Sequence, residues 1–158
     1  MTQKNNILIS LTPRHAGNVF AGTKTVELRR RPMHVSRGTI AWIYVKIPVG
    51  AIIGCVRIDS IHIQPPKTLW RDFAPVSGLS KSEFFSYFDD SPKGTALEIS
   101  NTIKFNTPLS LEFLKGHLSS FHPPQFFTNL NTESPLLGAL ELELKRSLKM
   151  LKKQKSLK

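Results

Sequence analysis

The segment from Gly22 to Pro32, GTKTVELRRRP, carries charged side chains at a spacing that could form a binding site. Because side chains alternate along a strand, Val26 and Leu28 are predicted to share an inward face. The other face then holds a mostly charged row, with Lys24 at the turn before it: Thr25, Glu27, Arg29 and Arg31. Arginine offers a planar fork to a phosphate or a base edge, lysine is a point charge, and glutamate accepts from an exocyclic amine. The pattern indicates either a site for an anionic or polar ligand, or an exposed strand face whose charges are simply solvated.

The spacing Gly22-x-Lys24-x-x-Glu27-x-Arg29 resembles G-x-K-x-x-E-x-R, the signature of the ASCH domain, a branch of the PUA-like barrels. The neighbouring residues are also similar to that family. These are the stretch ILISLTPRHAGNVFAGTKTVELRRR, the middle portion from Trp70 through SGLS to GTALEI, and PPQFF at 123–127. The resemblance implies a β-barrel whose cleft holds RNA or a nucleoside-like group, with Lys24, Glu27 and Arg29 facing the ligand. RNA or a nucleotide is therefore the expected partner, and no cofactor is implied.

The resemblance leaves open whether the protein is a binder or an enzyme. Some ASCH-like proteins are enzymes, including an acetylcytidine amidohydrolase and ribonucleases. In the amidase branch a threonine nucleophile stands three residues after the motif lysine, but here that position is Glu27, so the chemistry does not transfer. Lys24 and Glu27 could still perform acid–base work, with Tyr44 as a further candidate, or they could form a structural salt bridge. RNA or nucleotide binding is the main expectation, and an RNA-directed hydrolase (a ribonuclease or modified-nucleoside amidohydrolase) using the same cleft is the alternative.

Aromatic residues supply a second class of candidates. Trp70 falls between prolines and a Ser-Gly pair in a predicted loop over 67–79, where it could stack on a base. Trp42 and Tyr44 alternate with Ile43 and Val45, which favours core packing. The expected ligand-binding set is therefore Gly22, Lys24, Glu27, Arg29, Arg31 and Trp70.

Other chemistry has little support in the sequence. The five histidines show no spacing typical of a metal site, so no metal is expected, and neither a glycine-rich phosphate loop nor a G-x-S-x-G motif occurs. Cys55, the only cysteine, lies in the apolar run AIIGCV and is expected to be buried and unreactive.

The elements that would position these residues follow from periodicity and turn signals. Strands are predicted at 7–11, 25–31, 39–46, 51–63 and 95–105, with a bulge or bend at Gly54. Thr12-Pro13 begins a helix that Gly22 ends, Ser80 to Glu83 forms a capping box for a short helix, and Pro123-Pro124 opens another. A leucine stripe predicts a long terminal helix: Leu137, Leu140, Leu144, Leu148 and Leu151. We therefore expect an α+β, mostly β fold: a PUA-like barrel domain over 1–132 with short flanking helices, and a basic amphipathic helix over 133–158.

Charge is concentrated at one end of the 158-residue chain. Residues 145–158 contribute seven basic residues and no acid to a net charge of +11, which leaves +4 for the rest. The basic residues of this helix are predicted either to form a solubilising end or to contact phosphates without sequence preference. Its leucine stripe over 137–151 is expected to be buried against the barrel, a partner helix or a second copy of the chain. The N-terminus lacks a signal-like apolar core, no apolar run approaches the roughly 20 residues of a membrane span, and the single cysteine fits a reducing compartment. A cytoplasmic protein without a membrane partner is expected.

Overall fold

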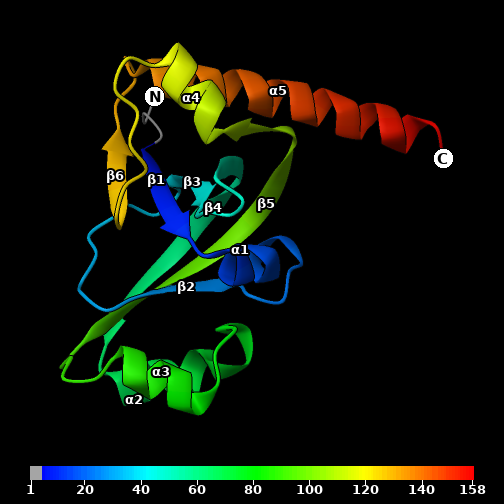
Figure 1. Cartoon of the computed structure of the whole chain (residues 1–158). Coiled ribbons are helices and arrows are strands. Elements are labelled where there is room, and N and C mark those ends of the chain that lie inside the picture. The colour runs from blue at the N-terminus through cyan, green and yellow to red at the C-terminus, as the bar shows by residue number, and fades with distance from the viewer. Residues whose placement is uncertain (1–4) are drawn as a thin grey trace.

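Six strands form a single mixed sheet in the computed structural model, which describes residues 5–158. The strands are β1 (Asn6–Leu11), β2 (Val26–Arg29), β3 (Ile40–Val45), β4 (Ala51–Gln64), β5 (Gly94–Ser110) and β6 (Phe127–Leu130). Their order across the sheet is β2-β5-β4-β3-β1-β6, and only the pair β1 and β3 is parallel. Figure 1 shows that the sheet is curled rather than flat. The α+β, barrel-like class expected from the sequence is confirmed.

The curl depends on an irregularity at Gly54. The register of β3 on β4 shifts between Ile43 and Tyr44, and that of β4 on β5 shifts between Ile52 and Gly54. A Cβ atom on Gly54 would lie 2.1 Å from the carbonyl oxygen of Ile103, so only glycine allows this approach of the two strands. The predicted bulge is therefore present.

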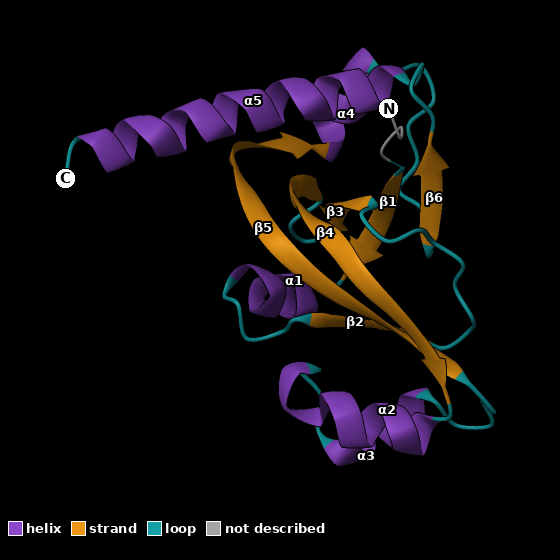
Figure 2. Ribbon diagram, turned by 180° about the vertical axis from the view of Figure 1, so that it is seen from behind, coloured by secondary structure: helices purple, strands orange, loops and turns teal. Residues whose placement is uncertain are grey.

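Five α-helices of the described residues surround the sheet (Figure 2). They are α1 (Pro13–Phe20), α2 (Pro66–Phe73), α3 (Lys81–Tyr87), α4 (Leu111–His117) and α5 (Pro135–Ser156), with a 3₁₀ turn η1 (Ala74–Val76) after α2. Helices α2 and α3 lie at one end of the molecule, whereas α4 and α5 lie at the other. No helix among residues 5–158 is both long and apolar enough to cross a membrane.

Local signals explain several helix boundaries. The Thr12 side chain accepts from the backbone N–H of His15, and Gly22 adopts φ +79° just after α1, which returns the chain towards β2. Ser80 and Glu83 form the predicted capping box of α3.

Three groups of buried side chains stabilise the fold. The central one lies between α1 and the sheet and includes Ile7, Val19 and Leu97. A second lies under α4 and α5, where Trp42 and Tyr44 pack as core residues, as expected. The third lies under α2 and α3 and receives Val26 and Leu28 from β2.

Two predicted elements are wrong. Residues 67–79 are largely helical, in α2 and η1, because Pro65 and Pro66 begin a helix there rather than a loop. The expected helix at 123–127 is absent, because the Ser10 N–H donates to the Phe126 carbonyl oxygen and residues 127–130 then pair with β1. Helix α4 was not predicted, and β5 runs five residues beyond the expected end at Phe105.

Candidate functional site

Strand β2 presents its charged residues to the centre of the fold. Val26 and Leu28 are 0% and 5% exposed and pack under α2 and α3. Glu27 is paired with Leu97, a member of the central core, so its side chain lies on the opposite face of the strand. The predicted alternation holds, but the charged face is far less exposed than a solvated strand face: Glu27 is 8% exposed.

Three motif side chains form a chain of contacts that we call the ladder: Lys24, Glu27 and Arg29. Lys24 Nζ donates to the Ser77 carbonyl oxygen at 2.6 Å and lies 3.9 Å from Glu27 Oε2. Glu27 Oε1 lies 3.3 Å from Arg29 Nε, and Arg29 Nη1 donates to the Phe126 carbonyl oxygen at 3.5 Å. The ladder thus connects β2, at one edge of the sheet, with the segment that enters β6 at the other edge.

The ladder has an excess of positive charge in a nearly solvent-free setting. Burial lowers the pKa of Lys24, an effect that neighbouring Glu27 partly opposes. Arg29 Nε faces Glu27 as an ion pair but without hydrogen-bond geometry, and Arg29 Nη2 is also buried without a hydrogen-bond partner in the described part of the chain. Two cations therefore flank one carboxylate, with guanidinium donors left unsatisfied.

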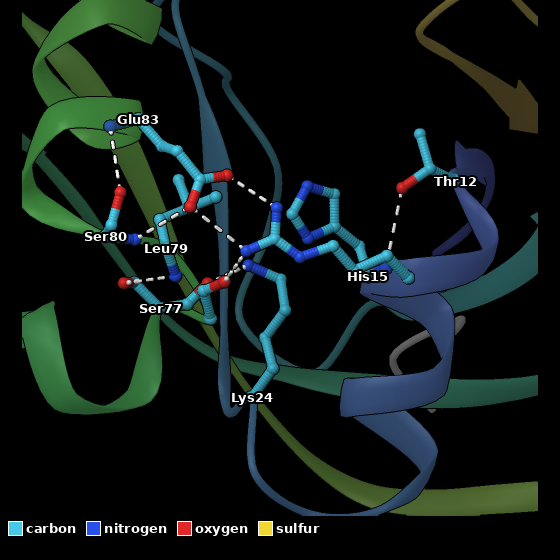
Figure 3. Close-up of polar contacts among 9 residues, drawn as sticks. Thr12, His15, Lys24, Ser77, Leu79, Ser80 and Glu83 are labelled. Atoms are coloured by element: carbon cyan, nitrogen blue, oxygen red, sulfur yellow. Dashed lines mark hydrogen bonds and ion pairs between the residues drawn. The ribbon is translucent and has the colours of Figure 1, made fainter.

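His15 is a neighbour of the ladder that the sequence analysis did not select. Figure 3 shows its ring projecting from α1 on the same side as the Lys24 side chain. Burial, and then the positive charge of Lys24, lower the pKa of His15, and its Nδ1 atom is buried without a hydrogen-bond partner among the described residues. The sequence could have pointed to His15 only through the Thr12-Pro13 helix start, which places His15 in the first turn of α1.

A second ion pair joins α1 to α3 beside the ladder. Arg14 Nη1 lies 2.5 Å from Glu83 Oε2, and Arg14 Nη2 donates to the Gly78 carbonyl oxygen at 3.1 Å. The Arg14 hydrogen bond lowers the pKa of Glu83 to about 2. Lys24 and Arg14 therefore use the adjacent carbonyls of Ser77 and Gly78, and Figure 3 shows this turn beside the Lys24 side chain.

The other predicted site residues lie apart from the ladder or have different surroundings. Gly22 supplies the positive-φ turn before Lys24, and Arg31 is exposed beyond the end of β2. Trp70 lies on α2, not in a loop, with its ring centroid 5.1 Å from that of Phe84. Tyr44 is 3% exposed and packs with Phe121 in the core under α4 and α5, so the structure does not bring it to the ladder.

A serine, a histidine and a glutamate also meet on β4 and β5, but not in a catalytic arrangement. His62 Nε2 lies 3.2 Å from Ser60 Oγ and 2.8 Å from Glu98 Oε2, and the serine hydroxyl also donates to that carboxylate. A nucleophile–base–acid relay needs the two partners on different ring nitrogens, whereas here both contact the same one.

Metal and thiol chemistry find no site in the described residues. Within 5–158, no group of three or more histidine, cysteine, aspartate and glutamate side chains is arranged to hold a metal ion. Burial raises the pKa of the Cys55 thiol to about 12, which confirms the buried, unreactive cysteine expected from the sequence.

Comparisons with known proteins agree with this architecture. A curated protein of Zymomonas mobilis subsp. mobilis, described as "ASCH domain-containing ribonuclease", is 32% identical over 130 residues, which cover 82% of this chain and 87% of the relative. The crystal structure of ASCH from Zymomonas mobilis superposes with a TM-score of 0.76 at 33% identity and covers 81% of this chain and 89% of that one. A serine-to-alanine mutant of the Zymomonas mobilis protein gives a TM-score of 0.77 at 32% identity, with coverage of 84% and 93%. No family model matches the chain.

The curled sheet, with its charged ladder at the closing edge, therefore defines a barrel-like fold of the ASCH type. At this identity and coverage, the chain belongs to the ASCH domain family.

Proposed function

We propose that this protein binds RNA and that the ladder holds one phosphate of the backbone. The similarity to a protein named a ribonuclease supports RNA as the class of ligand. A phosphate oxygen would supply the negative charge and the hydrogen-bond acceptor that the ladder lacks.

The unsatisfied guanidinium of Arg29 is the observation that carries this proposal. A buried charged donor without an acceptor is costly, by about 1–3 kcal/mol or more, so a site that retains one has a reason to do so. The Arg29 side chain keeps 14% exposure, against 2% for Lys24, so Arg29 is the more accessible of the two cations. Its Nη2 atom is itself buried, so contact with a phosphate requires the guanidinium, which among the described residues has only a 3.5 Å hydrogen bond to Phe126, to turn outwards.

The three side chains then have different roles. Arg29 makes the direct contact, and Glu27 orients its guanidinium through the 3.3 Å ion pair. Lys24 is buried and already donates to the Ser77 carbonyl oxygen, so it does not contact the ligand directly and adds positive electrostatic potential to the site. His15 is neutral at pH 7 because its pKa is lowered, so one of its ring nitrogens can accept a hydrogen bond.

The test compares Arg29→Ala and Arg29→Lys with a matched control, Arg71→Ala. Arg71 also pairs with a nearby carboxylate, Asp72, at 2.8 Å, but its side chain is 72% exposed on α2. Binding of a short fluorescein-labelled single-stranded RNA is measured by anisotropy, and thermal unfolding reports the fold of each variant.

Arg29→Ala is expected to weaken RNA binding by about 1–3 kcal/mol, and Arg29→Lys by a smaller amount because it keeps the charge but loses the fork. From the sequence alone, Arg29→Ala would be expected to leave the free energy of unfolding nearly unchanged. Because the Arg29 side chain is largely buried and donates to Phe126, we expect this free energy to fall by about 1 kcal/mol or more. The proposal would be contradicted if Arg29→Ala and Arg29→Lys both fold and bind RNA with wild-type affinity. It would also be contradicted if Arg71→Ala loses as much RNA affinity as Arg29→Ala.

RNA cleavage by the same site is the second candidate, and the neutral His15 beside Lys24 favours it. A base takes the proton from a ribose 2′-hydroxyl, and that oxygen attacks the adjacent phosphorus to form a 2′,3′-cyclic phosphate. The bond to the 5′-oxygen breaks, and this oxygen leaves with a proton taken from water. His15 and Glu27 are better placed for this than Tyr44, which lies in the other core. The RNA recovered from the binding assay decides between the two: intact strands support a binder, and fragments that disappear in Glu27→Gln or His15→Gln, with binding retained, support the hydrolase.

A further inference from the structure

The outer part of α5 is exposed in the described part of the chain. Buried side chains on this helix end at Ser147, and residues 148–158 are all exposed. Figures 1 and 2 both show the helix running past the edge of the sheet to a free end. About two and a half helical turns, from Leu148 to Ser156, therefore stand away from the body.

Basic side chains gather on one side of this helix. At about 100° per residue, five of them fall within a sector about 120° wide, opposite the buried line that includes Leu140 and Ser147. We call these five the basic stripe: Lys145, Arg146, Lys149, Lys152 and Lys153. No acidic residue occurs from 144 to 158, and the exposed acid next to the stripe is Glu141, four residues before Lys145.

The stripe costs stability in the free protein. Like charges four residues apart, such as Lys145 and Lys149, destabilise a helix by a few tenths of a kcal/mol per pair. The helix dipole favours cations only in the last turn, so it offsets the charge repulsion at Lys153 but not at Lys145 or Lys149. A polyanionic ligand would neutralise the whole stripe.

We propose that the basic stripe docks on the RNA phosphate backbone without reading its sequence. The choice of RNA rests on the proposed function, and the stripe adds a second contact remote from the ladder. A lipid surface fits less well, because Lys155 and Lys158 interrupt the apolar side formed by Leu148 and Leu151, and α5 has no aromatic residue.

The test reverses three charges of the stripe in the full-length protein, with Lys145→Glu, Lys149→Glu and Lys152→Glu combined. The matched control reverses three exposed lysines: Lys67 on α2, Lys81 at the start of α3 and Lys93 just before β5. Helices α2 and α3 lie at the opposite end of the molecule from α5 (Figure 1). Both variants change the net charge by the same amount. A difference in RNA affinity between them therefore depends on where the charges lie on the protein. A milder variant with glutamine at the three stripe positions covers the case in which charge reversal disturbs the helix.

The stripe variant is expected to bind the labelled RNA at least about tenfold more weakly, with the slope of log Kd against log salt reduced by about 2, or about 0.7 for each lost phosphate contact. The control should stay within about twofold, and Arg29→Ala should change the slope by no more than about 0.7. A loss in the stripe variant with none in Arg29→Ala would keep this inference and remove the ladder from the proposed function.

Three results would overturn the inference. The first is an equal effect of the stripe and control variants, or no effect of either. The second is binding to phosphatidylserine vesicles that exceeds binding to RNA and is lost in the stripe variant. The third is a dimer, seen by sedimentation, that the stripe variant dissociates while RNA affinity is unchanged.

Discussion

At the scale of single residues, the charged side chains of β2 make their contacts with remote parts of the chain. Glu27 lies on the face of the strand opposite Val26 and Leu28. The contacts of Lys24 with Ser77 and of Arg29 with Phe126 join residues 53 and 97 positions apart, which no spacing rule reveals. For the same reason His15 was not selected, since its unusual setting depends on Lys24.

The lowered pKa of His15 predicts a pH-dependent stability. Because the folded state disfavours the imidazolium, the unfolded state binds more protons at pH values between the folded pKa and the ordinary value of 6.5, and stability falls as the pH drops through this range. The melting temperature of the wild type should therefore fall more between pH 7 and pH 5 than that of His15→Gln.

The control for this effect is His122→Gln, at an exposed histidine in the segment before β6. It should keep the wild-type pH dependence. If His15→Gln keeps it as well, the buried neutral imidazole is not present in solution.

At the scale of elements, local signals predicted what local chemistry controls. The Thr12-Pro13 start, the Gly22 turn, the Ser80 capping box and the Gly54 bulge are all present. The segment at 123–127 was wrong because long-range pairing with β1 outweighs the helix-starting tendency of two prolines. Leu148 and Leu151, the last two leucines of the periodic row on α5, are 38% and 43% exposed. The leucine periodicity therefore continues beyond the part of the helix that packs on the sheet.

Helix α5 is fastened to β5 by two polar side chains. Pairing of β4 with β5 passes from Gly54↔Lys104 to Ile52↔Leu109, so residues 105–108 have no partner in β4. Glu143 Oε1 accepts from the Thr107 N–H at 3.1 Å, and Ser147 Oγ accepts from the Asn106 N–H at 2.9 Å. The helix thus satisfies two backbone donors that the bulged strand leaves free.

Removing the Glu143 carboxylate should destabilise the fold. Glu143→Ala leaves the Thr107 N–H without its acceptor and should cost about 1–3 kcal/mol in urea unfolding, whereas Glu143→Gln, which keeps an acceptor oxygen, should cost less. The exposed neighbour Glu141→Ala is the control and should change stability by no more than about 0.5 kcal/mol. Equal stabilities for the two alanine variants would show that Glu143 does not fasten the helix.

At the scale of the whole molecule, the contact between the two edges of the sheet and the projecting helix α5 are separate features. The ladder joins β2 to the segment before β6 and so links the two edges of the curled sheet. Much of the net positive charge lies on the outer part of helix α5, which projects past the sheet (Figure 1). The division into residues 1–132 and 133–158 remains a prediction, and the packing of Leu136, Leu137 and Leu140 into the core shows that the first half of the helix is part of the fold.

The central claim is that the Arg29 guanidinium contacts an RNA phosphate, and the most direct measurement observes that group itself. In ¹⁵N-labelled protein the arginine Nε–Hε resonances are followed during titration with a short single-stranded RNA, and the Arg29 signal is assigned by its loss in Arg29→Lys. We expect the Arg29 signal to shift and its hydrogen exchange to slow at saturation, while the signals of Arg57 and Arg71, exposed on β4 and α2, stay unchanged. An Arg29 signal that does not move while RNA is demonstrably bound would contradict the account.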